Sequence, residues 1–337
     1  MAAMHGLEVP DGFSGVISVT GPDGIDFERA YGLADRAHGI AMTTDTQLAI
    51  ASGTKGFTAA TVLGLIDDGA LSLDTTARSV LGADLPLIAD DVTVAHLLTH
   101  RSGIGDYVDE ELPEEQPLQV PVGVLESTPA YLPALDCFAA KFPAGSRFSY
   151  CNSGYVVLAL IAERVTRTPF EELVHRRVFE PAGMTDSAFL RSDRLPGRAA
   201  LGYLDDGRTN VFALPVLGSG DGGAYSTVAD VRSFWAALLA GQIVSQGAVS
   251  LMCHPSTSDT GQAMAYGVGL WLADGYLVLE GADQGVSFRS MFDPVSARTA
   301  TVVSNTGAGA WPIARQLRDR LQELSAAASG RTRPGHR

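Results

Sequence analysis

A serine and a lysine lie three residues apart in the stretch Ala51-Ser52-Gly53-Thr54-Lys55. Residues three apart on a helix are neighbours on one face, so the Ser52 hydroxyl and the Lys55 amine can touch. A serine hydroxyl is a weak nucleophile until a base takes its proton. Lysine can be that base when burial or nearby positive charge lowers its pKa. The pair therefore predicts a nucleophile, Ser52, and its proton acceptor, Lys55.

Lysine is rare in this chain, which makes its position informative. Of the 24 lysines and arginines, only Lys55 and Lys141 are lysines. Arginine stays protonated in proteins and cannot act as a base, whereas lysine can. A lysine beside Ser52 therefore favours a catalytic role over chance placement.

Composition and charge narrow the class of protein. The 337 residues are 46% hydrophobic and 18% charged, which is typical of a folded chain with one large or two interleaved domains. A net charge of −14 argues against nucleic-acid and membrane-surface partners. Three cysteines, no signal-peptide pattern at the start and no apolar run near about 20 residues predict a cytoplasmic protein without a membrane segment.

Strand signals occur at both ends of the chain and helical signals in the middle. Residues 56–68 are apolar on all sides, which predicts a buried helix directly after Ser52. Strands are expected at 15–20, 25–31, 266–273, 276–280, 286–292 and 299–304, and a terminal amphipathic helix carries Ile313, Leu317, Leu321 and Leu324.

This order predicts an α/β (α+β) fold in which helices flank an antiparallel sheet. Residues 1–75 and 206–327 are expected to form the sheet domain, and 76–205 a mostly helical insertion. Residues 328–337 are expected to be a disordered tail.

The Ser52-Gly53-Thr54-Lys55 stretch resembles the first motif of the serine β-lactamase and penicillin-binding-protein superfamily. Tyr150-Cys151-Asn152 resembles the second motif, Tyr-x-Asn, of its class C β-lactamase-like branch, which includes esterases, D-amino-acid peptidases and acyltransferases. The likeness runs from residue 10 to 325, with further matching stretches at 93–103, 142–155, 179–184 and 222–227.

The resemblance implies a role for each motif residue. Ser52 attacks an acyl carbon, while Lys55 and Tyr150 share its proton, with the pKa of Tyr150 held well below its usual value near 10. Asn152 hydrogen-bonds Lys55 and the substrate. The backbone N–H groups of Ser52 and Gly285 are expected to donate to the oxyanion.

The third motif of the superfamily is less complete in this chain. The stretch 281–287 corresponds to it, and Ala282 stands where a basic residue is expected. Loss of a cation that grips a substrate carboxylate favours esters or uncharged amides over β-lactams. Substrate contacts are expected from Tyr107, Ala282, Gln284, Ser287 and Arg289.

A serine hydrolase, first of all an esterase acting through an acyl-enzyme, is the expected function. An acyltransferase using a small-molecule acceptor, a β-lactamase or D-amino-acid peptidase, and an acylating sensor with little turnover remain alternatives. The expected partner is a small-molecule acyl substrate, with the oligomeric state left open.

No cofactor and no metal are expected. His96 and His100 are four residues apart, but they lack the glutamate of a zinc helix. Gly218-x-Gly220-x-x-Gly223 matches a dinucleotide fingerprint only in its glycines, so a loop before a helix is the preferred interpretation.

Overall fold

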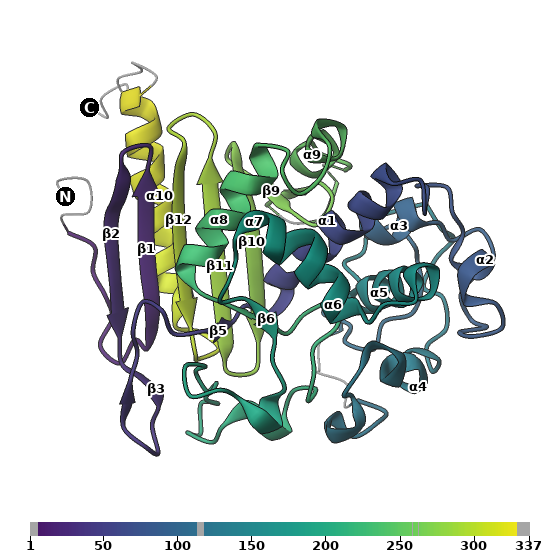
Figure 1. The fold of residues 1–337 in the computed structure, drawn as a ribbon, viewed down its shortest axis with the longest axis horizontal. Helices are drawn as coiled ribbons and strands as arrows, with labels where there is room; N and C mark the ends of the chain where they lie inside the picture. The colour runs from purple at the N-terminus through teal and green to yellow at the C-terminus, as the bar shows by residue number, and fades with distance from the viewer. Residues whose placement is uncertain (1–5, 113–117, 258, 262, 329–337) are drawn as a thin grey trace.

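The computed structural model describes residues 6–112, 118–257, 259–261 and 263–328. A seven-stranded antiparallel sheet forms one side of the molecule, and helices from the middle of the chain form the other (Figure 1). The strand order is β2-β1-β12-β11-β10-β9-β8, so the first two strands pair with the last ones. The predicted fold class and the predicted strands at both ends of the chain are therefore confirmed.

The strands of the large sheet are β1 (Gly15–Gly21), β2 (Gly24–Tyr31), β8 (Ala265–Tyr266), β9 (Trp271–Ala273), β10 (Tyr276–Asp283), β11 (Val286–Asp293) and β12 (Arg298–Ser304). Two small sheets accompany it. One pairs β3 (Leu33–Asp35) with β4 (Ile40–Ala41), and the other has the order β5 (Leu48–Ala49), β7 (Ala224–Ser226), β6 (Ala188–Phe189).

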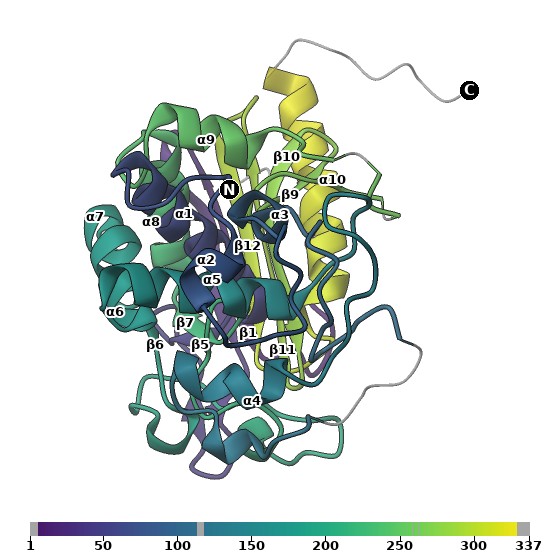
Figure 2. The same ribbon diagram turned by 90° about the vertical axis from the view of Figure 1, so that its right-hand side faces the viewer.

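Helices cover both faces of the large sheet. Along β1, Val16 belongs to the core that contains α1 (Thr54–Asp67) and α8 (Val228–Leu239), whereas its neighbour Ile17 packs with α10 (Ala310–Ala328). Successive side chains of a strand point to opposite faces, so the alternation seen in the sequence separates two cores. Figure 2 shows α10 along one side of the sheet.

The remaining α-helices are α2 (Ala77–Leu81), α3 (Val94–Leu98), α4 (Leu132–Leu135), α5 (Asn152–Thr166), α6 (Phe170–Val174), α7 (Glu180–Ala182) and α9 (Gln246–Cys253). A π-helical turn, His175–Phe179, joins α6 to α7. Short 3₁₀ turns are η2 (Ala51–Gly53), η3 (Val122–Val124), η4 (Thr128–Tyr131), η6 (Ser192–Arg194) and η7 (Asn210–Phe212).

The predicted division at residues 75/76 and 205/206 stays a prediction. Strand β6 comes from the proposed insertion, yet it pairs with β7 from the sheet portion of the chain. At the carboxyl end, α10 continues to Ala328, so the first residue of the predicted tail is helical, and 329–337 lie outside the described residues.

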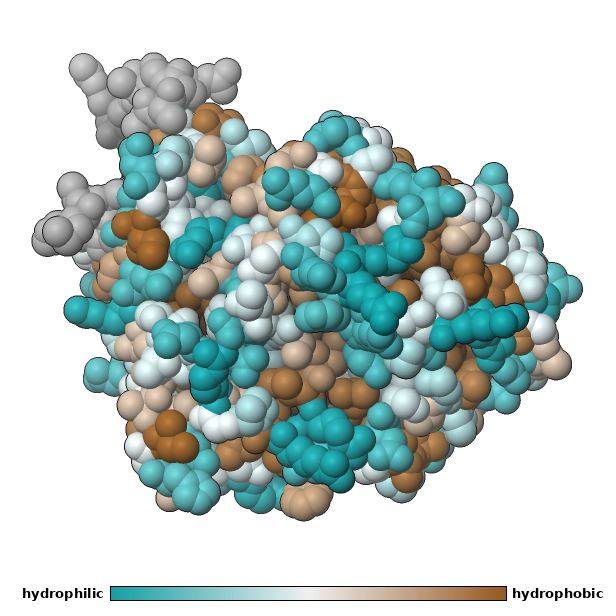
Figure 3. Space-filling model, viewed as in Figure 1, coloured by the Kyte–Doolittle hydropathy of each residue, from teal (hydrophilic) through white to brown (hydrophobic). Residues whose placement is uncertain are grey.

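The described part of the chain contains no helix that is both long and apolar enough to cross a bilayer. On the face drawn in Figure 3, apolar and polar residues are interspersed.

Helix α1 is the element that positions the candidate nucleophile. Its residues from Thr54 to Leu65 are buried, as an all-round apolar sequence predicts. The helix stops where Gly69 adopts a left-handed φ of 74°, the usual helix terminator. At the other end, η2 leads directly into α1, so Ser52 lies one turn before Lys55.

Candidate active site

Ser52 is held by a strained turn between β5 and α1. Ala51 has a left-handed φ of 45°, which is costly for a residue with a side chain. Three hydrogen bonds fix the turn: Ile50 N donates to Ala224 O, Gly53 N to Ile50 O, and the Thr54 hydroxyl to Ala51 O. Strain that is maintained in this way is common at functional sites.

The amine of Lys55 makes the predicted contact with Ser52. Lys55 Nζ donates to Ser52 Oγ at 2.9 Å, to Asn152 Oδ1 at 2.8 Å and to the backbone oxygen of Asp221 at 2.7 Å. An ammonium has three protons, so these three acceptors match its full capacity. The side chain is 2% exposed, which locks the amine against the serine.

Burial lowers the pKa of Lys55 below its ordinary value, although the nearby Asp221, Glu110 and Asp106 carboxylates oppose the shift. A lowered pKa increases the fraction of neutral amine at a given pH. The structure thus gives Lys55 both the position and the direction of pKa shift that a base needs.

Asn152 begins α5 rather than capping it, because Cys151 occupies the cap position. The cap comes from a distant residue: the Asp106 carboxylate accepts from Asn152 N and from Ser153 N, both at 2.8 Å. Burial raises the pKa of Asp106 to about 6. No local sequence pattern predicts this contact, because Asp106 lies 46 residues before Asn152.

The Asn152 side chain is held from both of its ends. Its oxygen accepts from Lys55 Nζ, and its amide nitrogen donates to Val108 O at 2.9 Å and to Glu110 Oε1 at 3.2 Å. These contacts fix the amide orientation, so the predicted bond between Asn152 and Lys55 is present.

Tyr150 lies over the lysine. Lys55 Nζ is 4.8 Å from the Tyr150 ring centroid, and the ring stacks on Trp271 at 5.7 Å. The expectation of a depressed phenol pKa is wrong. Burial, followed by the charge of Glu110, raises the pKa of Tyr150 well above its usual value, although the hydrogen-bond partner Ser52 lowers it. Tyr150 is therefore a neutral phenol that can donate a proton.

His100 packs against the segment that carries Tyr150 and Cys151, and its contacts differ from those of His96. Its Nδ1 accepts from Cys151 N at 3.0 Å, its backbone oxygen accepts from Ser149 N, and its ring lies 4.3 Å from that of Tyr150. His96 instead accepts from Thr93 N within the capping of α3. Within the described residues, no group of three or more metal-binding side chains converges.

The strand beside Ser52 is β10, and the residue of closest approach is Gly281. A Cβ added to Gly281 would lie 2.3 Å from Ile50 O and 2.7 Å from Ser52 N. Gly285 lies instead at the tip of the β10–β11 hairpin, where an added Cβ would meet Tyr203 N at 2.8 Å. The prediction that Gly285 donates to the oxyanion is therefore corrected, because its backbone adjoins Tyr203 and not Ser52.

The backbone of Ala282 is better placed. Asp283 of β10 pairs with Val286 of β11 across a two-residue turn. At the other end of β10, Tyr276 pairs with Ala273 of β9 across a second two-residue turn. Along an antiparallel strand, successive residues direct their N–H and C=O groups alternately to the neighbouring strand on one side and to the strand on the other. Ala282 therefore directs its N–H to the edge away from β11. Strand β9 pairs only with 276–278 of β10, so this N–H lies at a free edge, next to the glycine that touches Ser52.

Two predicted substrate contacts belong to the opposite face of the sheet. Ser287 is fully buried, and its hydroxyl donates to Thr306 O and accepts from Ala310 N at the start of α10. Arg289 pairs with Glu280 across the hairpin and lies over the Trp311 ring. Both predictions are corrected, because these side chains are engaged with α10 and with their own hairpin.

The other predicted substrate contacts differ in outcome. Tyr107 is buried, and its hydroxyl donates to Asp221 Oδ2 at 2.5 Å. The phenol is therefore engaged with the protein interior and does not face a substrate. The Ala282 side chain shares a sheet face with its cross-strand partner Ser287, so it does not stand where a cation would reach Ser52. Gln284 is exposed at the hairpin tip, and its substrate contact stays a prediction.

Substitution of Gly281 by alanine is expected to impair catalysis strongly. The new methyl group would collide with backbone atoms of Ile50 and Ser52, which cannot rotate away. Overpacking of this kind costs roughly 1–3 kcal/mol and would displace the nucleophile. Thermal denaturation and the kcat/KM of ester hydrolysis measure the two effects. Gly197→Ala is the matched control, because an added Cβ there meets nothing within 4 Å; equal behaviour of the two variants would contradict the predicted close approach.

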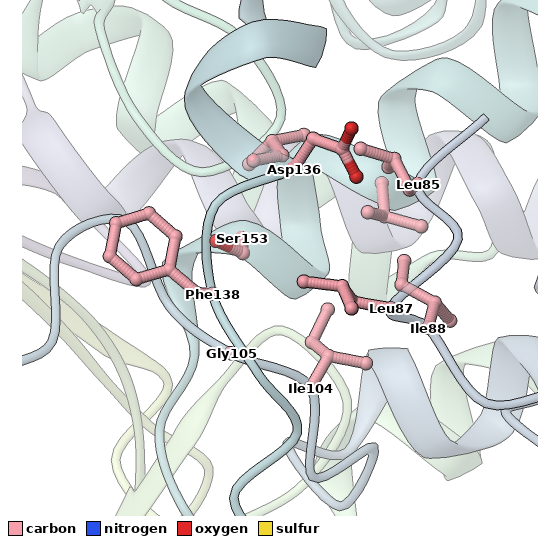
Figure 4. A pocket seen from close by; sticks show the side chains of 10 residues that line it. Leu85, Leu87, Ile88, Ile104, Gly105, Asp136, Phe138 and Ser153 are labelled. Atoms are coloured by element: carbon pink, nitrogen blue, oxygen red, sulfur yellow. The ribbon is translucent and has the colours of Figure 1, made fainter. Parts of the chain in front are cut away.

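One small cavity lies near the site but does not open onto it. Leu85, Leu87, Ile88 and Ile104 line it on one side and Phe138 on the other (Figure 4). It has room for about one water molecule, so it is a packing gap and not a substrate pocket.

The chain is similar to known proteins in sequence and in structure. A family model described as Beta-lactamase matches residues 10–324. The crystal structure of a penicillin-binding protein from Bacillus halodurans superposes with a TM-score of 0.85 at 35% sequence identity, over 91% of this chain and 96% of that one.

Two curated relatives match over shorter regions. Penicillin-binding protein 4 of Amycolatopsis lactamdurans is 33% identical over 199 residues, which cover 58% of this chain and 49% of that protein. Esterase EstB of Burkholderia gladioli is 34% identical over 203 residues, which cover 57% of this chain and 50% of that protein. The matches span about half the length of these two relatives.

Proposed function

The chain belongs to the β-lactamase family of serine hydrolases, and from this premise we propose that it hydrolyses small-molecule esters through an acyl-enzyme on Ser52. The observation that carries the proposal is the buried Lys55 amine, 2.9 Å from the Ser52 hydroxyl and with a lowered pKa. Esters are the first choice because of the charge around the site, and the similarity to an esterase supports this choice.

In the proposed acylation step, Ser52 Oγ attacks the acyl carbon and its proton passes to the neutral amine of Lys55. Tyr150, a neutral phenol beside Ser52, donates a proton to the leaving oxygen and recovers one from Lys55. General acid–base help of this kind contributes on the order of 10²–10⁴ in rate. Water then attacks the acyl-enzyme by the reverse sequence, and Ser52 is regenerated.

Two backbone N–H groups are proposed to stabilise the charge that develops on the acyl oxygen. One is that of Ser52, in the first turn of a helical segment, where N–H groups lack helical acceptors. The other is that of Ala282 at the free edge of β10. Backbone donors that are fixed before the reaction cost no reorganisation, and one such donor is worth about 10²–10³ in rate.

The charges near Ser52 support a preference for substrates without a carboxylate. Glu110 Oε1 lies 3.2 Å from the Asn152 amide, and Asp221 is buried next to Lys55. Nearby cations are engaged elsewhere: Arg289 pairs with Glu280, and Lys141 pairs with Asp109 and Glu111. An anionic substrate would therefore meet like charges.

A matched pair of substrates tests the proposal. We expect p-nitrophenyl butyrate to be hydrolysed with a higher kcat/KM than mono-p-nitrophenyl succinate, which adds one carboxylate to a similar chain. The difference should be on the order of tenfold and should shrink as salt screens the repulsion. A chromogenic cephalosporin, which also bears a carboxylate, should be turned over more slowly than the neutral ester.

Equal kcat/KM values for the two esters would contradict the charge argument. Faster turnover of the cephalosporin than of either ester would instead identify a β-lactamase. Release of p-nitrophenol that accelerates with added alcohol would identify an acyltransferase, and a single stoichiometric burst would identify a sensor. The cytoplasmic location expected from the sequence stays a prediction.

A further inference from the structure

The glycine-rich loop 218–223 is packed directly behind the nucleophile and its base. A Cβ added to Gly220 would lie 2.1 Å from Tyr155 O, and one added to Gly218 would lie 2.3 Å from Gly222 O. The Thr58 hydroxyl donates to Gly220 O at 2.6 Å, which ties the loop to α1. Gly220 is therefore needed for close packing against α5, and Gly218 for the close approach of the loop to itself.

Asp221 of this loop interacts with Lys55 through both its backbone and its carboxylate. Its backbone oxygen accepts from Lys55 Nζ at 2.7 Å, and its carboxylate contributes the largest charge effect on Lys55. Asp221 is 9% exposed, so little water competes with these interactions. A buried carboxylate beside a buried amine favours the protonated amine.

The carboxylate of Asp221 is itself held by one phenol. Tyr107 OH donates to Asp221 Oδ2 at 2.5 Å, and Tyr107 N donates to Ser153 Oγ at 2.9 Å on α5. Burial, followed by the Asp221 charge, raises the pKa of Tyr107 well above its usual value, so the phenol remains a donor. Tyr107 therefore links α5, Asp221 and Lys55 in one chain of contacts.

We propose that Asp221 and Tyr107 are a buried pair of positioning residues that fixes the Lys55 amine and sets the pH range in which Ser52 is acylated. The proposal rests on the proposed function, because it assigns the control of the base to a residue pair outside the Ser52, Lys55, Tyr150 and Asn152 group. Neither residue touches Ser52 in the contacts described above.

The other titratable groups around Lys55 come from several elements. They are Glu110 and Asp106 from the segment before α4, His100, Tyr150 and Cys151 around the start of α5, Tyr155 on α5, and Asp283 on β10. The carboxylates favour the protonated amine. Burial, followed by the Lys55 charge, holds the pKa of His100 well below its usual value, so His100 adds no competing positive charge.

The direction of the effect follows from the charge of Asp221. The rate of acylation rises with pH as Lys55 loses its proton, and this rise forms the acid limb of the pH profile. Removal of the carboxylate charge makes the proton easier to lose. In Asp221→Asn the acid limb should therefore move to lower pH by about one unit or more. The asparagine keeps the backbone oxygen and offers Tyr107 an acceptor, so the plateau rate should stay within a few-fold of the wild-type rate.

The test uses the rate at which a fluorophosphonate probe labels Ser52, measured as a function of pH on the full chain by intact mass. Tyr107→Phe removes the donor to Asp221, so the carboxylate ionises less readily and the acid limb should move in the same direction, but less far. In the Asp221→Asn background, Tyr107→Phe should add no further shift, because no carboxylate remains to be influenced.

Two controls match the substitutions. Asp230→Asn removes another buried aspartate, one that accepts from Ser187 and from Asp186 N and makes no contact with Lys55. Tyr203→Phe removes the hydroxyl of another buried tyrosine, one that accepts from Arg36 N at 2.7 Å. Both should lower the melting temperature in proportion to a lost hydrogen bond, but neither should move the acid limb.

The outcomes separate this proposal from the proposed function. If Ser52 is labelled with an acid limb that Asp221→Asn leaves in place, the assignment of Asp221 is overturned while the acyl-enzyme stands. An equal shift in Asp230→Asn would also overturn it. Failure of the wild-type protein to be labelled at Ser52 would remove the proposed function, and this proposal with it.

Discussion

Ser52→Ala is expected to abolish ester hydrolysis while leaving the fold intact. The hydroxyl is the atom that forms the acyl-enzyme, so no other group in the site can replace it. Its loss removes one of three acceptors of the Lys55 amine, and Asn152 Oδ1 and Asp221 O remain. We therefore expect the initial rate with p-nitrophenyl butyrate to fall to the uncatalysed background, with little change in melting temperature.

The control for this substitution is Ser79→Ala, which removes an exposed hydroxyl that donates to Thr76 O on α2. It should retain the wild-type rate. A Ser52→Ala protein that still hydrolysed the ester well above background would contradict the assignment of the nucleophile.

Lys55→Met should slow the acylation of Ser52 by a factor on the order of 10²–10⁴, the usual contribution of a positioned base. Methionine is of similar length and fits an apolar site, so the packing of α1 should change little. The acid limb that reports Lys55 should disappear with the amine. Single-turnover labelling of Ser52 across pH measures both the rate and the limb.

Lys55→Arg separates the base from the positive charge. Arginine keeps the charge but cannot give up its proton, so its labelling rate should be as low as that of Lys55→Met. Lys141→Arg is the control, because Lys141 is the only other lysine and pairs with Asp109 at 2.9 Å, away from Ser52. An arginine variant that kept more than about a tenth of the wild-type rate would show that charge, not proton transfer, is what Lys55 supplies.

Local patterns predicted much of the fold and part of the site. The apolar sequence after Ser52 predicted the buried helix α1, and the strand signals at both ends of the chain predicted the strands of the large sheet. The spacing of Ser52 and Lys55 predicted their contact because both residues lie on one short helical stretch. These features depend on neighbours in sequence, which a single chain displays directly.

The errors arose where the site depends on residues far apart in sequence. Asp106 and Asp221 reach Asn152 and Lys55 across 46 and 166 positions, and nothing in the local sequence marks them. The substrate contacts expected from the third motif were wrong because the sequence does not reveal which face of the sheet a residue occupies. Gly281 on β10 approaches Ser52, whereas Ser287 and Arg289 on β11 face α10. The expected shift of the Tyr150 pKa had the wrong direction, because burial and the Glu110 charge outweigh the hydrogen bond with Ser52.

Intact-mass analysis after treatment with a fluorophosphonate probe tests the central claim most directly. We expect one adduct per wild-type chain, carried by the peptide that contains Ser52, and no adduct on Ser52→Ala under the same conditions. An unlabelled wild-type protein, or an adduct that persists in Ser52→Ala, would contradict it.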